Sequence, residues 1–140
     1  MTTAAVTIGT TSTTWVQTPT NLNSTVGTLS ARTAARVLAI TSSATPTINT
    51  DSYDCVNITA LAAAITSMTT NLTGTPANFD QLEFRIKDDG TARAITRGAS
   101  FITGVGTMAT TTVAGKPLHE FYEWDTVQSK WVCMFSGSEP

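Results

Sequence analysis

Residues 81–88 carry the clearest structural signal in the chain, because apolar and charged side chains alternate there at a period of two. Leu82, Phe84 and Ile86 are the apolar members of this pattern, and charged residues separate them. A strand with one buried and one solvated face has this period, whereas an amphipathic helix repeats its apolar positions every three or four residues. The pattern therefore predicts a β-strand.

The predicted strand runs into a turn signal at Asp89-Gly90. Asp-Gly supplies the positive φ angles that a tight hairpin turn requires, and residues 91–96 follow as a second predicted strand. Residues 81–98 are therefore expected to form a β-hairpin. The adjacent acids at this turn, together with Glu83, also suggest a Ca²⁺ site, but turn formation explains them more simply because Asp tolerates left-handed backbone.

Composition favours strands over helices throughout the chain. Thirty of the 140 residues are threonine, whose branched side chain suits a pleated surface. Charged residues make up only 13% and the net charge is −2, with no basic tract. This balance argues against a nucleic-acid-binding protein, whose affinity depends on neutralising phosphates. We also expect no signal peptide and no membrane span, because no apolar run is long enough.

One segment departs from the strand pattern and predicts the only helix. Leu61, Ile65, Met68 and Leu72 are spaced at four, three and four residues, and alanines lie between them. Thr59 is a suitable N-cap, and Gly74 and Pro76 would end the helix. The apolar stripe of this helix is expected to pack on the core.

The remaining segments complete a predicted mainly β fold, an antiparallel β-sandwich or barrel with one short helix and an extended N-terminal arm. Residues 1–46 are expected to form the arm, either flexible or ordered on a neighbouring subunit, and residues 47–140 the compact domain. The further strands are expected at 14–16, 37–40, 54–59, 99–105, 108–113, 118–124 and 131–135. The last strand is expected to present Trp131, Cys133 and Phe135 on one face.

The inventory of catalytic side chains is thin, so we expect no enzyme, no cofactor and no metal. His119 is the only histidine, and it lies in an alternating strand pattern without the second histidine that a zinc helix would supply. No nucleophile elbow and no phosphate-binding glycine loop occur. Cys55 and Cys133 are expected to be reduced, buried thiols on neighbouring strands, although a disulfide between them is an alternative.

The candidate interface residues are arginines and aromatics, the side chains most enriched at protein contacts. They are Trp15, Arg32, Arg36, Arg85, Arg93, Arg97, Tyr122 and Trp124. An alternative interpretation makes the aromatics Tyr53, Tyr122, Trp124 and Trp131 a sugar-stacking platform, although core or interface positions are favoured for them.

From about Ile48 to Val132 the chain resembles a small β-rich module found in virion proteins of tailed bacteriophages. The matching residues are Asn49-Thr-Asp-Ser-Tyr-Asp, Ile58-Thr-Ala-Leu, Thr73-Gly-Thr-Pro, Leu82-Glu-Phe-Arg-Ile-Lys-Asp-Asp-Gly-Thr-Ala-Arg, Gly98-Ala-Ser-Phe, Thr111-Thr-Val-Ala-Gly-Lys and Lys130-Trp. The Asp-Asp-Gly-Thr-Ala-Arg segment is the most specific part. The family usually has Trp where this chain has Arg97.

The resemblance implies a non-enzymatic structural protein of the virion exterior, made in the host bacterial cytoplasm. A protein that decorates and stabilises the capsid through subunit contacts, as a homo-trimer on the major capsid protein, fits the short chain best. A minor tail or receptor-binding protein that contacts a host surface glycan is the close alternative. A soluble carbohydrate-binding module is a more remote one. Neither nucleic acid nor membrane is an expected partner.

Overall fold

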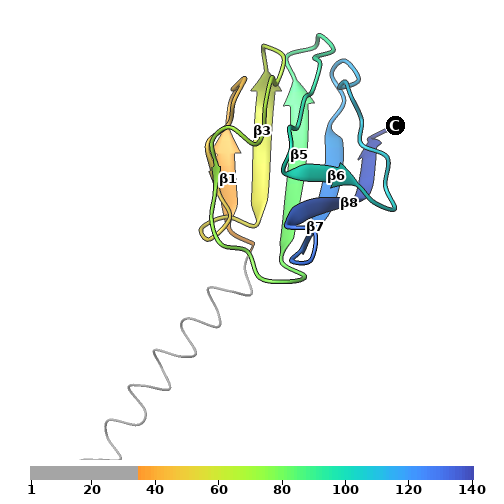
Figure 1. Ribbon diagram of the computed structural model, residues 1–140. Helices are drawn as coiled ribbons and strands as arrows, with labels where there is room; N and C mark the ends of the chain where they lie inside the picture. Colours follow the sequence, from red (N-terminus) through yellow and green to blue (C-terminus); the bar gives the residue numbers. More distant parts are fainter. Residues whose placement is uncertain (1–34) are drawn as a thin grey trace, which may run out of the picture. The chain divides into compact units, whose positions relative to one another are not determined.

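The computed structural model describes residues 35–140, which form eight β-strands (Figure 1). Six of them make one mixed sheet in the order β1-β3-β5-β7-β8-β6, and β2 and β4 make a second, two-stranded sheet. The strands are β1 (Val37–Ile40), β2 (Ile48–Asn49), β3 (Cys55–Leu61), β4 (Leu72–Thr73), β5 (Gln81–Asp88), β6 (Phe101–Thr103), β7 (Leu118–Asp125) and β8 (Lys130–Ser138).

One half of the molecule is a parallel, solenoid-like stack. Strands β1, β3 and β5 pair in parallel and in register, so that equivalent residues of successive turns of the chain lie beside one another. Leu38, Val56 and Phe84 form one such row. The chain passes from β1 through β2 to β3, and from β3 through β4 to β5, and β2 pairs with β4 in parallel as well. Each turn of the chain therefore adds one strand to each of the two sheets.

The other half of the main sheet is antiparallel. β5 pairs with β7, and β7 pairs with β8 through the hairpin that joins them across residues 126–129. Strand β6, which precedes β7 and β8 in the chain, pairs in parallel with β8 at the edge of the sheet. It crosses in front of β7 in Figure 1. Strand β5 is thus the junction between the parallel stack and the antiparallel hairpin.

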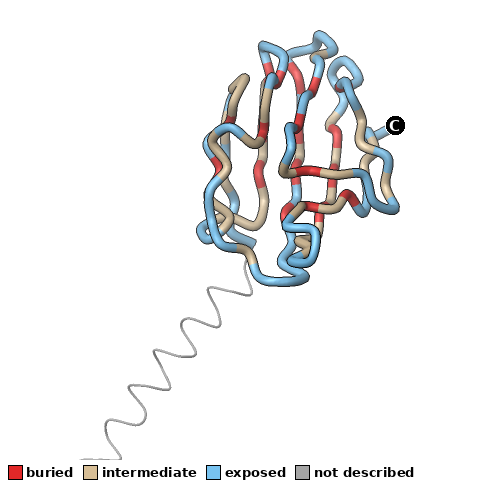
Figure 2. The backbone as a smooth tube through the Cα atoms, in the orientation of Figure 1, coloured by how far each residue is buried: buried red, intermediate tan, exposed pale blue. Residues whose placement is uncertain are grey.

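The core lies between the inner face of the main sheet and the segments that fold over it (Figure 2). Phe84, Phe101 and Tyr122 meet there in edge-to-face contacts, with ring centroids 5.0–5.9 Å apart. This geometry is the one that aromatic pairs prefer. Ile65 and Ile95 form an isolated parallel bridge in the covering layer, and both are buried.

The predicted strands at 37–40, 54–59, 81–88, 118–124 and 131–135 are confirmed as β1, β3, β5, β7 and β8. β1 precedes the expected start of the compact domain at residue 47, and it forms the first strand of the sheet. The prediction that Phe135 shares a face with Trp131 and Cys133 is wrong. The pairing of β8 with β7 shifts by one residue next to Phe135, which leaves this side chain 55% exposed.

The predicted helix between Thr59 and Gly74 is wrong, and the described residues contain no helix. Leu61 ends strand β3, Ile65 forms the isolated bridge, and Leu72 begins β4. The expectation that the apolar residues pack on the core is confirmed for Leu61, Ile65 and Met68, which are buried. These residues lie on one turn of extended chain that winds over the core. The amide and the carbonyl of Ile65 form hydrogen bonds with the backbone of residues 94 and 96, and not with residues of the same segment as a helix would require.

The predicted hairpin at residues 81–98 is also wrong beyond its first strand. β5 pairs with β3 and β7, so both of its edges are occupied before the chain reaches Asp89-Gly90. Gly90 does adopt a positive φ of 100°, as the turn signal requires. The chain then crosses to the covering layer, where Ile95 pairs with Ile65 and Ala94 pairs with Thr111. Arg85 of β5 therefore lies opposite His119 of β7, and not opposite a residue of the segment that follows the turn.

The predicted antiparallel sandwich or barrel is therefore wrong as a fold class. The protein is mainly β, but its main sheet is mixed and its first half is a parallel stack. The predicted strand at 99–105 shortens to β6, and residues 108–113 contribute only the bridge at Thr111. The expected strand at 14–16 lies outside the described residues. No helix within residues 35–140 is long and apolar enough to cross a membrane.

Candidate binding site

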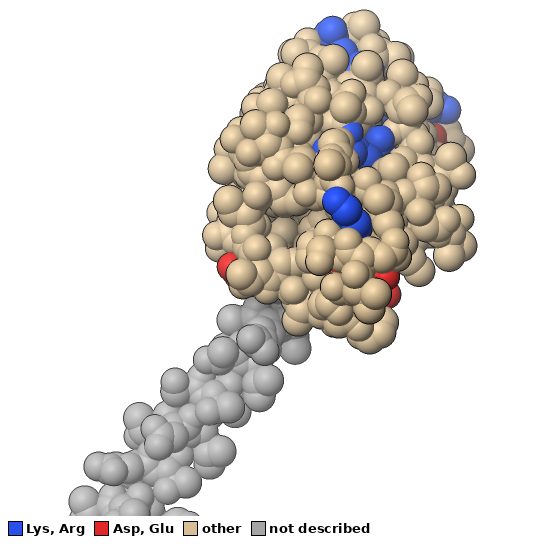
Figure 3. Space-filling view, viewed as in Figure 1, with Lys and Arg blue, Asp and Glu red and all other residues tan. Residues whose placement is uncertain are grey.

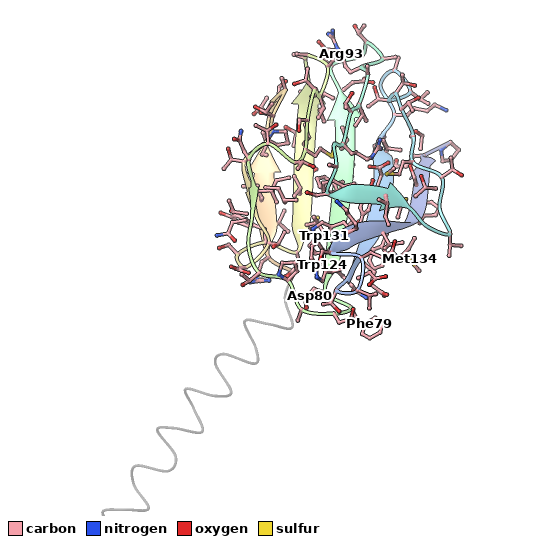
Figure 4. All side chains as sticks on the ribbon, in the orientation of Figure 1. Phe79, Asp80, Arg93, Trp124, Trp131 and Met134 are labelled. Carbon is pink, nitrogen blue, oxygen red and sulfur yellow. The ribbon has the colours of Figure 1, made fainter. Side chains whose placement is uncertain are left out.

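A hollow of about 270 Å³ opens at the end of the sheet where β5 begins. It lies between the loop that precedes β5 and the β7–β8 hairpin, and Figure 4 shows Phe79, Asp80 and Trp124 at this end, with Arg93 at the opposite one. Its lining combines aromatic, aliphatic, amide and carboxylate side chains. The lining residues are Asn78, Phe79, Glu123, Trp124, Asp125, Val127, Gln128, Val132 and Met134.

Backbone and side-chain hydrogen bonds fix both walls of the hollow. The amide of Phe79 donates to the carbonyl of Trp124 at 3.0 Å, and the amide of Trp124 donates to the carbonyl of Asp80 at 2.8 Å. The side-chain oxygen of Asn78 accepts from the amide and the hydroxyl of Thr126, each at 3.1 Å. The loop is thereby attached to the hairpin at three points.

These bonds hold Phe79 in an unfavourable state. Its φ is +68°, a left-handed conformation that costs a residue with a Cβ about 1–3 kcal/mol. Its side chain is 68% exposed, and Val127 at the hairpin tip is 93% exposed. Large apolar side chains held in solvent by a strained backbone are typical of binding surfaces. We therefore take this hollow as the candidate binding site.

Trp124 separates this hollow from a smaller one of about 150 Å³ on the other side. The smaller hollow is lined by Trp131, Pro76 and threonine and serine side chains. The rings of Trp124 and Trp131 meet edge to face at 5.3 Å, so Trp131, which is 2% exposed, supports Trp124 from the core side. Trp124 thus has a fixed position between the two hollows.

Two of the candidate interface residues, Arg97 and Tyr122, belong to a buried polar cluster instead of the surface. The guanidinium of Arg97 forms a salt bridge with Glu120, which has no exposed area, and Arg97 Nε donates to Tyr122 Oη at 2.7 Å. Tyr122 Oη donates to Glu120 at 3.0 Å, and the hydroxyl of Ser136 donates to the same carboxylate at 2.7 Å. Arg97 therefore occupies the core side of the sheet.

Burial and hydrogen-bond partners have opposite effects on the pKa of Arg97 in this cluster. Burial disfavours the charge of Arg97, but its hydrogen bonds to Glu120 outweigh burial and raise the pKa of the guanidinium above its ordinary value. Burial, reinforced by the nearby charge of Glu120, raises the pKa of Tyr122 far above its ordinary value. The tyrosine therefore stays neutral and acts as a hydrogen-bond donor to the carboxylate.

Two other candidate arginines, Arg36 and Arg85, have separate partners. Arg36 Nε donates to Asp54 Oδ2 at 2.9 Å, and these bonds hold the pKa of the Asp54 carboxyl below its usual value. Arg85 contacts Asn57 at 3.5 Å, on the face of the sheet that points away from the core. Trp15 and Arg32 lie outside the described residues. The arginines within residues 35–140 thus form no single patch, and the face in Figure 3 consists mostly of uncharged residues.

Arg93 and the adjacent acids organise the connection that follows β5. Arg93 pairs with Asp89 at 2.7 Å, and Asp88 is 2% exposed. Asp88 accepts hydrogen bonds from the amides of Gly90 and Gly115 and from the hydroxyl of Thr112. Asp88 thus ties two loops together, and the most specific part of the sequence resemblance has a structural role. Residues 35–140 contain no cluster of three or more acids, histidines or cysteines that could hold a metal.

Replacing Asp88 with Asn is expected to destabilise the protein by about 1–3 kcal/mol, because the two backbone amides at Oδ1 lose a charged acceptor and the Thr112 hydroxyl at Oδ2 faces an NH₂ donor instead of an acceptor. Burial raises the pKa of Asp88, but its three hydrogen bonds outweigh burial and hold the pKa below its usual value. A carboxyl of this kind contributes stability above its unfolded pKa of about 3.9, and the contribution is lost as the pH falls through the folded pKa. Thermal unfolding from pH 7 to pH 2 should show a smaller acid loss in the variant. An identical acid loss in both proteins would contradict this role.

The aromatic residues of the predicted sugar platform and His119 complete the set of predicted site residues. The proposed sugar platform of Tyr53, Tyr122, Trp124 and Trp131 is wrong, because Tyr122 and Trp131 are buried. His119 lies on β7 as expected, with Nε2 at 2.8 Å from Glu139 and Nδ1 at 3.8 Å from Glu83.

The two cysteines are free thiols, as expected. Cys133 is buried and Cys55 half-buried. Burial raises the pKa of both thiols. Their strands, β3 and β8, are not neighbours in the sheet, so that part of the prediction is wrong.

Sequence reasoning found Trp124 but not the other apolar residues of the hollow. Phe79 lies in the segment Thr75-Pro-Ala-Asn-Phe-Asp, which reads as a loop, and a large aromatic residue in such a loop was the available signal. Val127 similarly stands alone in the polar connection between two strands. Comparison of the chain with protein-family models, with curated proteins and with solved structures found no match to any of them.

Proposed function

We propose that the protein is a non-enzymatic structural component of a tailed-phage virion, which decorates and stabilises the exterior of the capsid through contacts between subunits. The sequence resemblance described above supports this proposal. The major capsid protein and further copies of this chain, arranged as a trimer, are the proposed partners. A minor tail or receptor-binding role in the same particle is the alternative.

The observation that carries the proposal is the edge of the parallel stack at β1, which no strand of residues 35–140 covers. Strand β1 is the outermost strand of its sheet and pairs only with β3 among the described residues. Val37 is 52% exposed, and Leu38 and Ile40 are only partly buried although they pack against the core. A parallel stack needs a cover over its last strand, and an open edge can pair with a strand from another chain. Such pairing would attach the protein to a neighbour in a shell.

The first experiment locates the protein on purified particles by electron cryo-microscopy. Density for many copies over the capsid surface supports the decorating role, and density for a few copies at the tail supports the alternative. Absence of the protein from purified particles would overturn both proposals.

A lysine on the edge strand β1 tests whether this edge attaches the protein to the particle. Ala39→Lys places a cation on the exposed side of β1, where charge discourages strand pairing without disturbing the core. We expect an unchanged melting temperature and a large loss of incorporation into particles, measured by quantitative immunoblotting. Thr59→Lys, on the exposed side of β3, is the matched control and should incorporate normally. Deletion of residues 2–30 tests the predicted arm in the same assay, and unchanged incorporation would exclude an assembly role for it.

A further inference from the structure

We propose that the hollow beside Phe79 is a binding site for a neutral pyranose sugar. The proposal depends on the side chains that line the hollow, and it stands independently of the virion role. It replaces the incorrect four-residue aromatic platform with a different site, to which only Trp124 is common.

The apolar part of the hollow matches the face of a sugar ring. A pyranose has one face of C–H groups, which packs against an aromatic side chain, while its hydroxyl groups point outward. Phe79 is available for such packing because its side chain is 68% exposed, and Met134 and Val127 lie in the same lining. The hydrogen bonds that attach the loop to Trp124 and Thr126 hold Phe79 in place before binding. Binding of a ligand would therefore cost little conformational entropy of this loop.

The polar part of the hollow offers both donors and acceptors that no other group of residues 35–140 uses. The carboxylate of Glu123 has no hydrogen-bond partner within residues 35–140, and the amide nitrogen of Asn78 has none either. Gln128 uses its nitrogen to donate to Asp125 at 2.8 Å, which leaves its oxygen as a free acceptor. Sugar hydroxyl groups both donate and accept, so they match this mixed set better than an ion of either sign would.

Charge selects against anionic and cationic ligands. Glu123 and Asp125 are the charged residues of the lining, and no Lys, Arg or His is among them, so an anionic sugar would be repelled. A cation would need several carboxylate oxygens, but Asp125 already accepts from the amides of Val127 and Gln128 and from the Gln128 side chain. These bonds hold the pKa of Asp125 below its usual value, and among the described residues of the lining Glu123 is the one carboxylate without a hydrogen-bond partner. A neutral polar ligand remains, and a sugar is the neutral ligand that also matches the apolar wall and the mixed donors and acceptors of the lining.

Size limits the ligand to a short saccharide. The hollow of about 270 Å³ lies just below the range of about 300–1,000 Å³ that is common for small-molecule sites. It therefore has room for one ring, and a longer chain would extend into solvent past the exposed hairpin tip at Val127.

The test uses the full chain and NMR titration with glucose, galactose and N-acetylglucosamine, together with N-acetylneuraminic acid as an anionic probe. We expect at least one neutral sugar to shift the amide signals of residues 78–80 and 123–128, and the anionic sugar to shift none. Phe79→Ala should weaken binding by roughly five- to tenfold, the effect of losing about one aromatic contact. Glu123→Gln, which keeps the shape of the side chain, should weaken it less.

Phe135→Ala is the matched control, because Phe135 is also a half-exposed phenylalanine but does not line the hollow. This variant should bind as tightly as the unchanged protein. Thermal melting of all three variants verifies that they remain folded. Absence of any shift with the three neutral sugars would overturn the proposal, as would equal affinities of the Phe79→Ala and Phe135→Ala variants.

Discussion

Replacing Arg97 with Met is expected to lower the free energy of unfolding by about 3–5 kcal/mol, because it leaves the carboxylate of Glu120 buried without its cation. Glu120 has no exposed area, and its remaining partners are the hydroxyl groups of Tyr122 and Ser136. Neutral donors compensate a buried charge only in part. Equilibrium unfolding in urea, followed by tryptophan fluorescence, measures the difference.

The double variant Arg97→Met/Glu120→Met separates the pair from its surroundings. Removing both charges should recover most of the loss, because a buried ion pair often contributes little beyond what apolar side chains of similar volume would. Arg85→Met is the control, since Arg85 is partly exposed and makes one long contact with Asn57. It should change stability by less than about 1 kcal/mol. An effect of Arg97→Met no larger than that of Arg85→Met would contradict the buried-pair role.

The sequence predicted most of the main strands correctly because their apolar alternation is a local property. Residues 81–88 show this best, since every second side chain of β5 is buried. The helix prediction failed at Leu61, Ile65 and Met68 for a physical reason. An extended chain that winds around a core brings apolar residues back to that core wherever the chain bends. The positions of the bends therefore set the sequence spacing of the buried residues, and here that spacing coincides with a helical period. Pattern alone does not separate the two cases.

The hairpin prediction failed because strand pairing is decided by distant residues. Asp89-Gly90 makes a turn, but strand β3 and strand β7 already occupy both edges of β5. The parallel register between β3 and β5 spans 28 residues, from Cys55 to Glu83, and no local motif specifies it. A parallel partner requires a long connection, whereas the Asp-Gly signal describes only the nearest residues.

The candidate site was predictable only in part. Trp124 was selected because aromatic residues are enriched at protein contacts, and it does line the hollow. Phe79 was missed because its role depends on three hydrogen-bonded attachments between its loop and the β7–β8 hairpin, more than forty residues away. Arg97 was predicted to be an interface residue because arginine is enriched at protein contacts, and Glu120, the partner that makes its burial possible, lies 23 residues further along the chain on β7.

Replacing Phe84 with Ala is expected to lower the free energy of unfolding by about 3–5 kcal/mol. Phe84 has no exposed area and lies at the junction of the two halves of the sheet, where it is paired with Val56 on one side and Glu120 on the other. Its ring also meets Phe101 and Tyr122 edge to face, at 5.9 and 5.8 Å. The substitution therefore removes two aromatic contacts and leaves a cavity that the surrounding strands cannot close.

Phe135→Ala is the matched control for this substitution, because it removes the same atoms from a side chain that is 55% exposed. It should cost less than about 1 kcal/mol. Phe84→Leu should fall between the two, since leucine fills most of the volume but makes no aromatic contact. Urea unfolding of the three variants measures the order. If Phe84→Ala were no more destabilising than Phe135→Ala, the packing between the parallel stack and the antiparallel hairpin would not be the core of this fold.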